Sequence, residues 1–79
     1  MPKKVFVNVT ADFMPDGQIM PRSFVWEDGR SFEIDRIIDI RPAASLKVGG
    51  QGLRYTCRIM GKQSFMFLED GRWFMESKQ

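Results

Sequence analysis

The residues that could do chemistry in this chain are few. There is no histidine and only one cysteine, Cys57. This excludes a Ser-His-Asp triad, a Cys-His pair, and a histidine or multi-thiolate metal site. Cys57 shares the alternation of Tyr55 and Ile59, which indicates a small buried side chain rather than a nucleophile. We therefore expect no enzyme, no metal and no cofactor.

Ten acidic residues remain as candidates for general acid–base catalysis. Asp35 and Asp39 lie four residues apart on one predicted strand face, about 13 Å between their Cα atoms. That separation is too large for the two carboxyl groups to share a proton. The glycine-rich stretch 49–52 lacks the Lys-Ser or Lys-Thr ending of a phosphate-binding loop and is followed by a strand. We interpret it as a loop and predict no catalytic residue.

The elements that must position these residues have a period of two. Alternating apolar and polar residues predict strands over 5–13, 19–27, 31–41, 53–60, 63–69 and 72–76. Turns are predicted at 14–17, Asp28-Gly29, Gly61-Lys62 and Asp70-Gly71, where glycine accepts a positive φ. The expected fold is all-β: a six-stranded antiparallel meander that curls into a small SH3-like or half-open barrel.

Length and composition place this fold in a single small domain over residues 1–79. The 43% hydrophobic fraction is typical of a globular chain, and the net charge is only +2. No apolar run approaches the length of a membrane helix, and none follows the basic start of the chain. These observations favour a cytoplasmic protein without a membrane partner.

The alternation also predicts which side chains form the core. One residue, Arg36, falls in the core phase between Ile34 and Ile38, where an unpaired guanidinium would be costly. We therefore expect a β-bulge near 35–37 that turns Arg36 outward and Ile37 inward. The predicted core is Val7, Val9, Phe24, Trp26, Phe32, Ile34, Ile38, Tyr55, Cys57, Ile59, Phe67 and Trp73.

Two outward-facing arginines, Arg54 and Arg58, flank Thr56 on the predicted fourth strand. Small barrels often bind single-stranded nucleic acid on a basic, aromatic sheet face. The structural alternative is that these arginines meet carboxylates on the preceding strand, at Glu33, Asp35 and Asp39. The sequence favours that alternative because acidic and basic residues alternate. The possible binding surface is Arg54 and Arg58, extended by Arg22, Arg41 and Lys47, and also by Arg30 and Arg36.

The outward phase of the strands is not cleanly polar. Either bulges shift the phase, or an apolar patch is exposed and contacts a protein partner or a second copy of the chain. The residues concerned are Phe6, Val25, Ile37, Met66, Leu68 and Phe74.

Several motifs together resemble a family of short uncharacterised bacterial proteins, a domain of unknown function. The resemblance covers about residues 21–76 and implies a small bacterial cytoplasmic domain without an assigned activity, cofactor or catalytic residue. Its motifs are Pro21, Phe24-Val25-Trp26, the segments 29–34 and 52–59, and Trp73-Phe74.

The sequence thus predicts a non-catalytic binding module. The first hypothesis is a protein-interaction or self-associating β-barrel module that uses the mixed apolar face. The alternative is a weak nucleic-acid-binding small β-barrel that uses Arg54 and Arg58. A contiguous positive surface beside aromatic side chains would favour nucleic acid, whereas arginines paired with carboxylates would favour protein.

Overall fold

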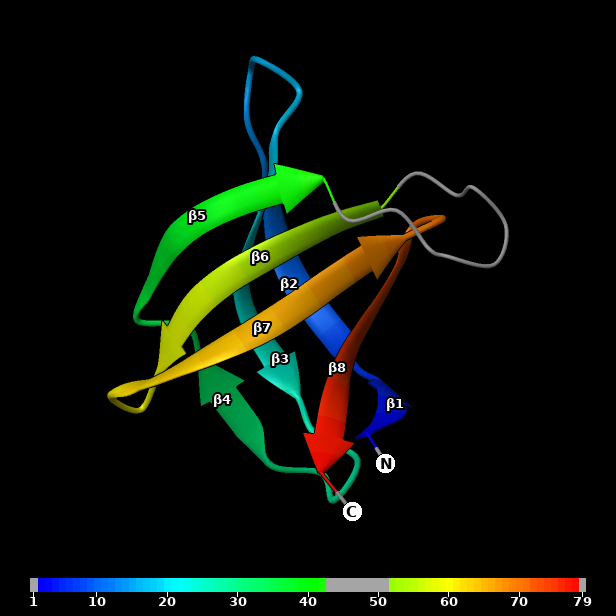
Figure 1. Ribbon diagram of the computed structural model, residues 1–79. Coiled ribbons are helices and arrows are strands. Elements are labelled where there is room, and N and C mark those ends of the chain that lie inside the picture. Colours follow the sequence, from blue (N-terminus) through cyan, green and yellow to red (C-terminus); the bar gives the residue numbers. More distant parts are fainter. Residues whose placement is uncertain (1, 43–51, 79) are drawn as a thin grey trace.

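A computed structural model describes residues 2–42 and 52–78, and every regular element in these ranges is a β-strand (Figure 1). This confirms the predicted all-β class. Within the described ranges no helix is long and apolar enough to cross a membrane. The strands are β1 (Pro2–Phe6), β2 (Asn8–Phe13), β3 (Ile19–Val25), β4 (Ser31–Glu33), β5 (Arg36–Pro42), β6 (Gly52–Ile59), β7 (Lys62–Glu69) and β8 (Arg72–Lys78).

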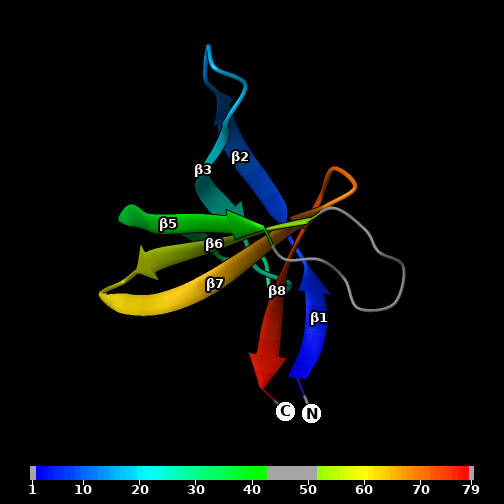
Figure 2. The same cartoon turned by 45° about the horizontal axis from the view of Figure 1, so that its top comes forward.

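The strands form two antiparallel sheets. A five-stranded sheet has the order β1-β8-β7-β6-β5, and a three-stranded sheet has the order β2-β3-β4. The two views in Figures 1 and 2 show the β2–β3 hairpin crossing behind the larger sheet and projecting beyond it. The described residues form eight strands in two sheets, so the predicted arrangement of six strands in one meander is not confirmed.

Two bends account for this difference. The predicted first strand bends at Val7, whose N–H donates to the carbonyl of Trp73 at 3.1 Å. The predicted third strand bends at Ile34–Asp35. Here the N–H of Ile34 donates to the backbone carbonyl of Arg22 in the smaller sheet at 2.9 Å. The N–H of Asp35 donates to the backbone carbonyl of Arg58 in the larger sheet at 2.8 Å. Each bent strand therefore enters both sheets.

The hairpin turns follow the positions of glycine. Asp70-Gly71 is a two-residue turn as predicted, and both residues have a positive φ. Between β3 and β4 the loop is longer than the predicted dipeptide. Trp26 and Arg30 pair across it through a 2.8 Å hydrogen bond, with Gly29 at φ 90°. Between β6 and β7 the turn is Met60-Gly61, one residue earlier than predicted, because Ile59 pairs with Lys62.

The Met60 turn yields a stability prediction. Met60 has φ 52°, a left-handed conformation that costs a residue other than glycine or asparagine about 1–2 kcal/mol. Asn-Gly is the preferred dipeptide for this kind of turn. Met60→Asn should therefore stabilise the protein by about 1 kcal/mol and raise its Tm by roughly 4–8 °C in a thermal melt. Met60→Ala keeps the strain and is the control, so an equal rise in both variants would contradict the explanation.

The core lies between the two sheets. Its most buried large side chains are Tyr55, Cys57 and Met66. The Tyr55 hydroxyl donates to the carbonyl of Ile19 at 2.5 Å and so joins the larger sheet to the smaller one. Five predicted core residues are buried: Val7, Phe24, Tyr55, Cys57 and Ile59. Five more are partly buried against them: Val9, Trp26, Phe32, Ile34 and Trp73.

Two core predictions are wrong. Ile38 is 43% exposed because the register of β5 shifts between Ile37 and Asp39, which leaves Ile38 in the bulge. The side chain of Phe67 points away from the core, and Phe67 pairs with Phe74 on the neighbouring strand. In its place Met66 and Leu68, which were predicted to face outward, are buried.

The expected reorientation of Arg36 is confirmed, although the bulge lies elsewhere. Arg36 is exposed, and Ile37 is half-buried and packs against the core. The bend at Ile34–Asp35 interrupts the strand before Arg36, and the bulge itself follows Ile37. The irregular backbone thus keeps a charged guanidinium out of the apolar interior.

Candidate functional site

The larger sheet has an outer face, which we define as the side away from the three-stranded sheet; Figure 1 views this side. Residues directly opposite one another in antiparallel strands project to the same face. The pairing therefore places one row of side chains across all five strands. From β1 to β5 the row is Phe6, Phe74, Phe67, Arg54 and Arg41.

The aromatic half of this row is a packed cluster. The Phe67 and Phe74 rings stack with centroids 5.0 Å apart, and Phe6 meets Phe74 edge-on at 5.8 Å. Phe74 is 4% exposed, whereas Phe6 is 50% exposed and Phe65, on the neighbouring row, is 42% exposed. Two phenylalanine rings are therefore partly exposed on the same face as the packed Phe67–Phe74 pair.

Cations lie directly on these rings. Such contacts between a cation and an aromatic face are attractive and hold both groups in place. The distances to the ring centroids are 4.6 Å for Lys4 over Phe74, 5.1 Å for Arg54 over Phe65 and 4.2 Å for Arg72 over Phe6.

Arg54 and Arg58 do not meet the carboxylates that the sequence favoured as their partners. Their cross-strand neighbours on β5 are Arg41 and Arg36. Like charges directly opposite one another are destabilising in the free protein. Among the described residues, neither Arg54 nor Arg58 takes part in a salt bridge. The predicted salt bridges are therefore absent among the described residues, although the charge of Arg54 helps to lower the pKa of Asp39.

The three predicted acidic partners are occupied elsewhere. Glu33 lies on β4 in the smaller sheet. Asp35 lies in the bend, where its carboxylate accepts a hydrogen bond from the Gly61 N–H at 3.3 Å. Asp39 lies opposite Thr56 on the outer face, and its carboxylate is 3.2 Å from Arg41 Nε. A hydrogen bond with the Thr56 side chain, and then the Arg41 guanidinium, lower the pKa of Asp39.

The remaining predicted surface residues do not form one site. Arg22 lies on β3 in the smaller sheet and forms a 2.7 Å ion pair with Asp12. Arg30 lies in the β3–β4 loop, 3.0 Å from Asp28. Arg36 and Arg41 join Arg54 and Arg58 on the outer face. Lys47 and the glycine-rich loop lie outside the described residues, apart from Gly52 at the start of β6.

Charge is distributed unevenly over the molecule. Among the residues whose side chains the structure describes, the outer face carries six basic residues but only three acidic ones. A net charge of +2 for the whole chain conceals this asymmetry. The basic residues are Lys4, Arg36, Arg41, Arg54, Arg58 and Arg72, and the acidic ones are Asp39, Glu69 and Glu76.

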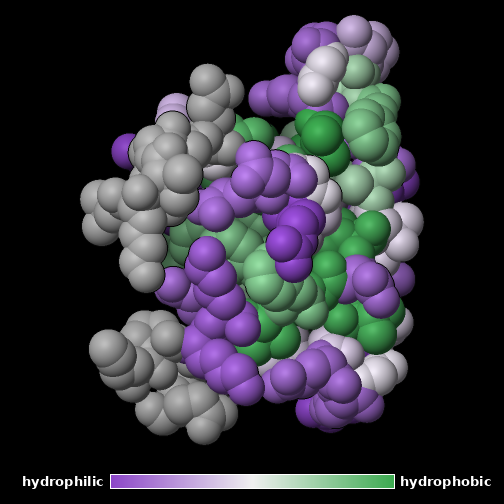
Figure 3. All heavy atoms as spheres, turned by 90° about the vertical axis from the view of Figure 1, so that its right-hand side faces the viewer, coloured by the Kyte–Doolittle hydropathy of each residue, from purple (hydrophilic) through white to green (hydrophobic). Residues whose placement is uncertain are grey.

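We call this combination of rings and cations the aromatic–basic face and define it by seven residues. Sequence reasoning assigned Phe6, Phe74 and Arg54 to the outward side but missed the other four. It placed Phe67 in the core because it assigned the sides of β7 without pairing this strand with β6. Figure 3, viewed from the right-hand side of Figure 1, shows hydrophobic residues reaching the surface beside hydrophilic ones. The seven residues are Phe6, Phe65, Phe67, Phe74, Lys4, Arg54 and Arg72.

Cys57 has the environment of a structural residue. It is fully buried, and burial raises the pKa of its thiol to about 11. A thiol with this pKa holds almost no thiolate at neutral pH and is a poor nucleophile. In the described part of the chain, no group of three or more histidine, cysteine, aspartate or glutamate side chains is placed to hold a metal ion.

No protein-family model, no curated protein and no solved structure matches this chain. The geometry of the outer face is therefore the basis on which a function can be argued.

Proposed function

We propose that this protein binds single-stranded nucleic acid across the aromatic–basic face. The observation that carries the proposal is the row of three phenylalanines and two arginines that crosses all five strands. Exposed rings on a sheet provide stacking platforms for unpaired bases, and adjacent cations attract the phosphates between them. A duplex offers no free base faces to such rings, so the expected ligand is single-stranded.

The opposed arginines support an anionic ligand in particular. Arg54 faces Arg41, and Arg58 faces Arg36, so positive charges lie opposite one another on neighbouring strands. Of these four arginines, only Arg41 forms a salt bridge with a described residue, the one to Asp39. Strands in a sheet are only about 4.8 Å apart. A phosphate placed over either pair would relieve this repulsion, whereas an apolar partner would strengthen it by excluding water. The face is therefore better suited to a polyanion than to a purely hydrophobic protein surface.

The wider setting remains part of the proposal. We propose that the protein is non-catalytic, bacterial and cytoplasmic. The cytoplasm is a compartment in which single-stranded RNA and DNA are present. The two bent strands, each pairing in both sheets, support the description as a small half-open barrel.

Binding should be electrostatic and therefore sensitive to salt. We expect a labelled oligonucleotide of about ten nucleotides to bind in fluorescence anisotropy. Its affinity should fall roughly tenfold or more between about 50 and 200 mM salt, as for a few released counterions. Arg54→Ala/Arg58→Ala should weaken binding by about tenfold at low salt and flatten the salt dependence.

The matched control is Arg22→Ala, which removes one arginine from the other sheet and is compared with Arg54→Ala alone. Arg22 is exposed and ion-paired with Asp12, so this variant should keep most of the affinity. An equal loss in both single variants would show that only net charge matters. The proposal fails on that result, and also if the folded wild-type protein binds no oligonucleotide at low salt.

A second candidate is the protein-interaction or self-associating module. It is favoured by the tip of the β2–β3 hairpin, where Phe13 is 78% exposed and Met14 is 43% exposed. An apolar tip on a projecting hairpin can insert into a partner surface. If this tip mediates self-association, sedimentation velocity will show a rise in mass with concentration that Phe13→Asp abolishes.

A further inference from the structure

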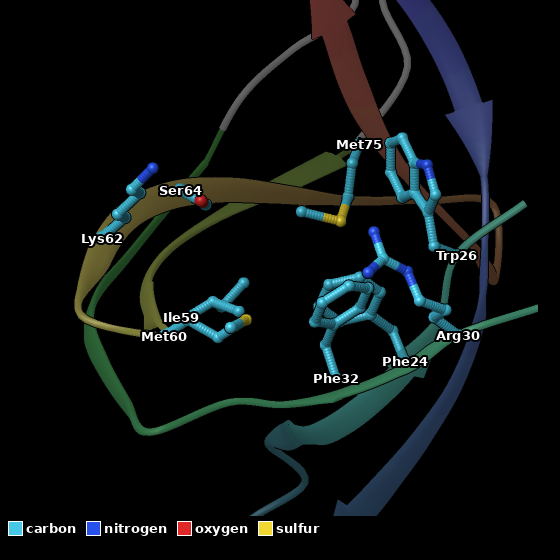
Figure 4. Close-up of a pocket in the computed structure, with 9 residues that line it drawn as sticks. All are labelled: Phe24, Trp26, Arg30, Phe32, Ile59, Met60, Lys62, Ser64 and Met75. Carbon is cyan, nitrogen blue, oxygen red and sulfur yellow. The ribbon is translucent and has the colours of Figure 1, made fainter. Parts of the chain in front are cut away.

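A pocket opens between the two sheets on the side opposite the outer face. It has a volume of about 350 Å³, within the range of small-molecule sites. Its walls come from both sheets: Phe24 and Phe32 from β3 and β4, and Ile59, Ser64 and Met75 from β6, β7 and β8. The β3–β4 loop and the start of β7 complete it (Figure 4).

One side of the pocket is aromatic. The Phe24 and Phe32 rings stack with centroids 5.4 Å apart and an interplanar angle of 26°. Trp26 is half-buried beside them. Figure 4 shows the Arg30 guanidinium between the indole and the phenyl rings, where it lies 5.5 Å from the centroid of Phe32. A flat aromatic ligand can stack on such a surface.

The opposite side of the pocket is polar. Lys62 and the half-buried Ser64 lie there, across the pocket from Trp26 in Figure 4. None of the described residues that line the pocket carries a carboxylate, although Asp28 binds Arg30 Nε at 3.0 Å from outside it. Lys62 forms no salt bridge with any described residue. The pocket therefore combines an apolar aromatic wall with an uncompensated positive charge.

We propose that this pocket binds a small molecule that carries a planar aromatic ring and an anionic group, such as a nucleoside monophosphate. The ring lies on the aromatic side of the pocket, against the Arg30 guanidinium that stands between Trp26 and the phenyl rings. The anion is held on the other side by Lys62 and the Ser64 hydroxyl. The site shares no residue with the aromatic–basic face, so it does not depend on the function proposed above.

The test is a ¹H–¹⁵N NMR titration with adenosine 5′-monophosphate, adenosine and inorganic phosphate as separate probes. The two indole N–H signals give an internal comparison, because Trp26 lines the pocket and Trp73 does not. We expect the monophosphate to shift the Trp26 signal and leave Trp73 in place. Adenosine should bind at least about tenfold more weakly, since it lacks the charged group that Lys62 holds.

Amino-acid substitutions test whether Lys62 is the residue that holds the anionic group of the ligand. Lys62→Ala should lower the affinity for the monophosphate about tenfold and leave the affinity for adenosine unchanged. Arg22→Ala, which removes an arginine remote from the pocket, should change neither of these two affinities. Arg54→Ala/Arg58→Ala should also leave this titration unchanged, which separates the pocket from the aromatic–basic face. The proposal is overturned if the Trp26 signal does not move, if adenosine binds as tightly as its monophosphate, or if Lys62→Ala binds the monophosphate normally.

Discussion

Tyr55→Ala is expected to leave the protein largely unfolded at room temperature. Tyr55 is 1% exposed, and its ring packs against Trp73 with centroids 5.1 Å apart. Removing a large buried side chain costs about 3–5 kcal/mol. The variant also loses the hydrogen bond to Ile19 that joins the two sheets. A domain of this size has a free energy of unfolding of only about 5 kcal/mol, so the substitution removes nearly all of its stability.

Tyr55→Phe separates the two contributions. It keeps the ring and removes only the hydroxyl, so it should stay folded and lose about 1 kcal/mol. Urea denaturation followed by circular dichroism measures both variants against the wild type. A cooperative Tyr55→Ala transition close to the wild-type midpoint would show that the sheets do not depend on this residue.

The second large effect concerns nucleic-acid binding. Phe6→Ala/Phe65→Ala removes the two exposed rings of the aromatic–basic face, and should lower affinity for a single-stranded oligonucleotide by at least about thirtyfold. Each stacked base contributes about 1–3 kcal/mol, so two lost stacks amount to about 2 kcal/mol or more. Because both rings are about half exposed, the fold should tolerate their removal. Fluorescence anisotropy at constant salt gives the affinity.

Phe13→Ala is the matched control for the double variant. Phe13 is more exposed than Phe6 or Phe65, but it lies on β2 in the other sheet. Its replacement should leave oligonucleotide affinity unchanged. If Phe6→Ala/Phe65→Ala binds as well as the wild type while Arg54→Ala/Arg58→Ala does not, then the contact is with phosphates alone and the stacking model is wrong.

Strand positions were largely predictable because they depend on neighbours in the chain. Alternation places Tyr55, Cys57 and Ile59 on one side of their strand whatever the rest of the fold does. Glycine marks the turns because a positive φ is strained for other residues, as at Gly29 and Gly71. The outward turn of Arg36 was predictable for the same kind of reason, since the cost of burying its charge is intrinsic to the side chain.

The face of β7 was assigned wrongly, although the sequence held a signal. When a two-residue turn joins two antiparallel strands, the sequence numbers of any two residues that pair across them add up to the same odd number. Tyr55 must therefore face an even-numbered residue of β7, and it does face Met66. Pairing the strands before assigning their faces would have placed Met66 and Leu68 inside, and Phe65 and Phe67 outside. The exact turn, Met60-Gly61, was not needed for that conclusion.

The sequence alone determined the all-β class, most strand positions, the turn glycines and the absence of histidine chemistry, because these follow from side-chain type and local alternation. Tertiary structure decided where the chain bends between sheets and which residues meet across them. A bend at Val7 or at Ile34–Asp35 depends on hydrogen bonds to distant strands, which no local pattern encodes. The opposition of Arg54 to Arg41 depends in turn on a register shift between Ile37 and Asp39. A shift of one residue moves every later side chain to the other face, so the bulge decided which charges lie together.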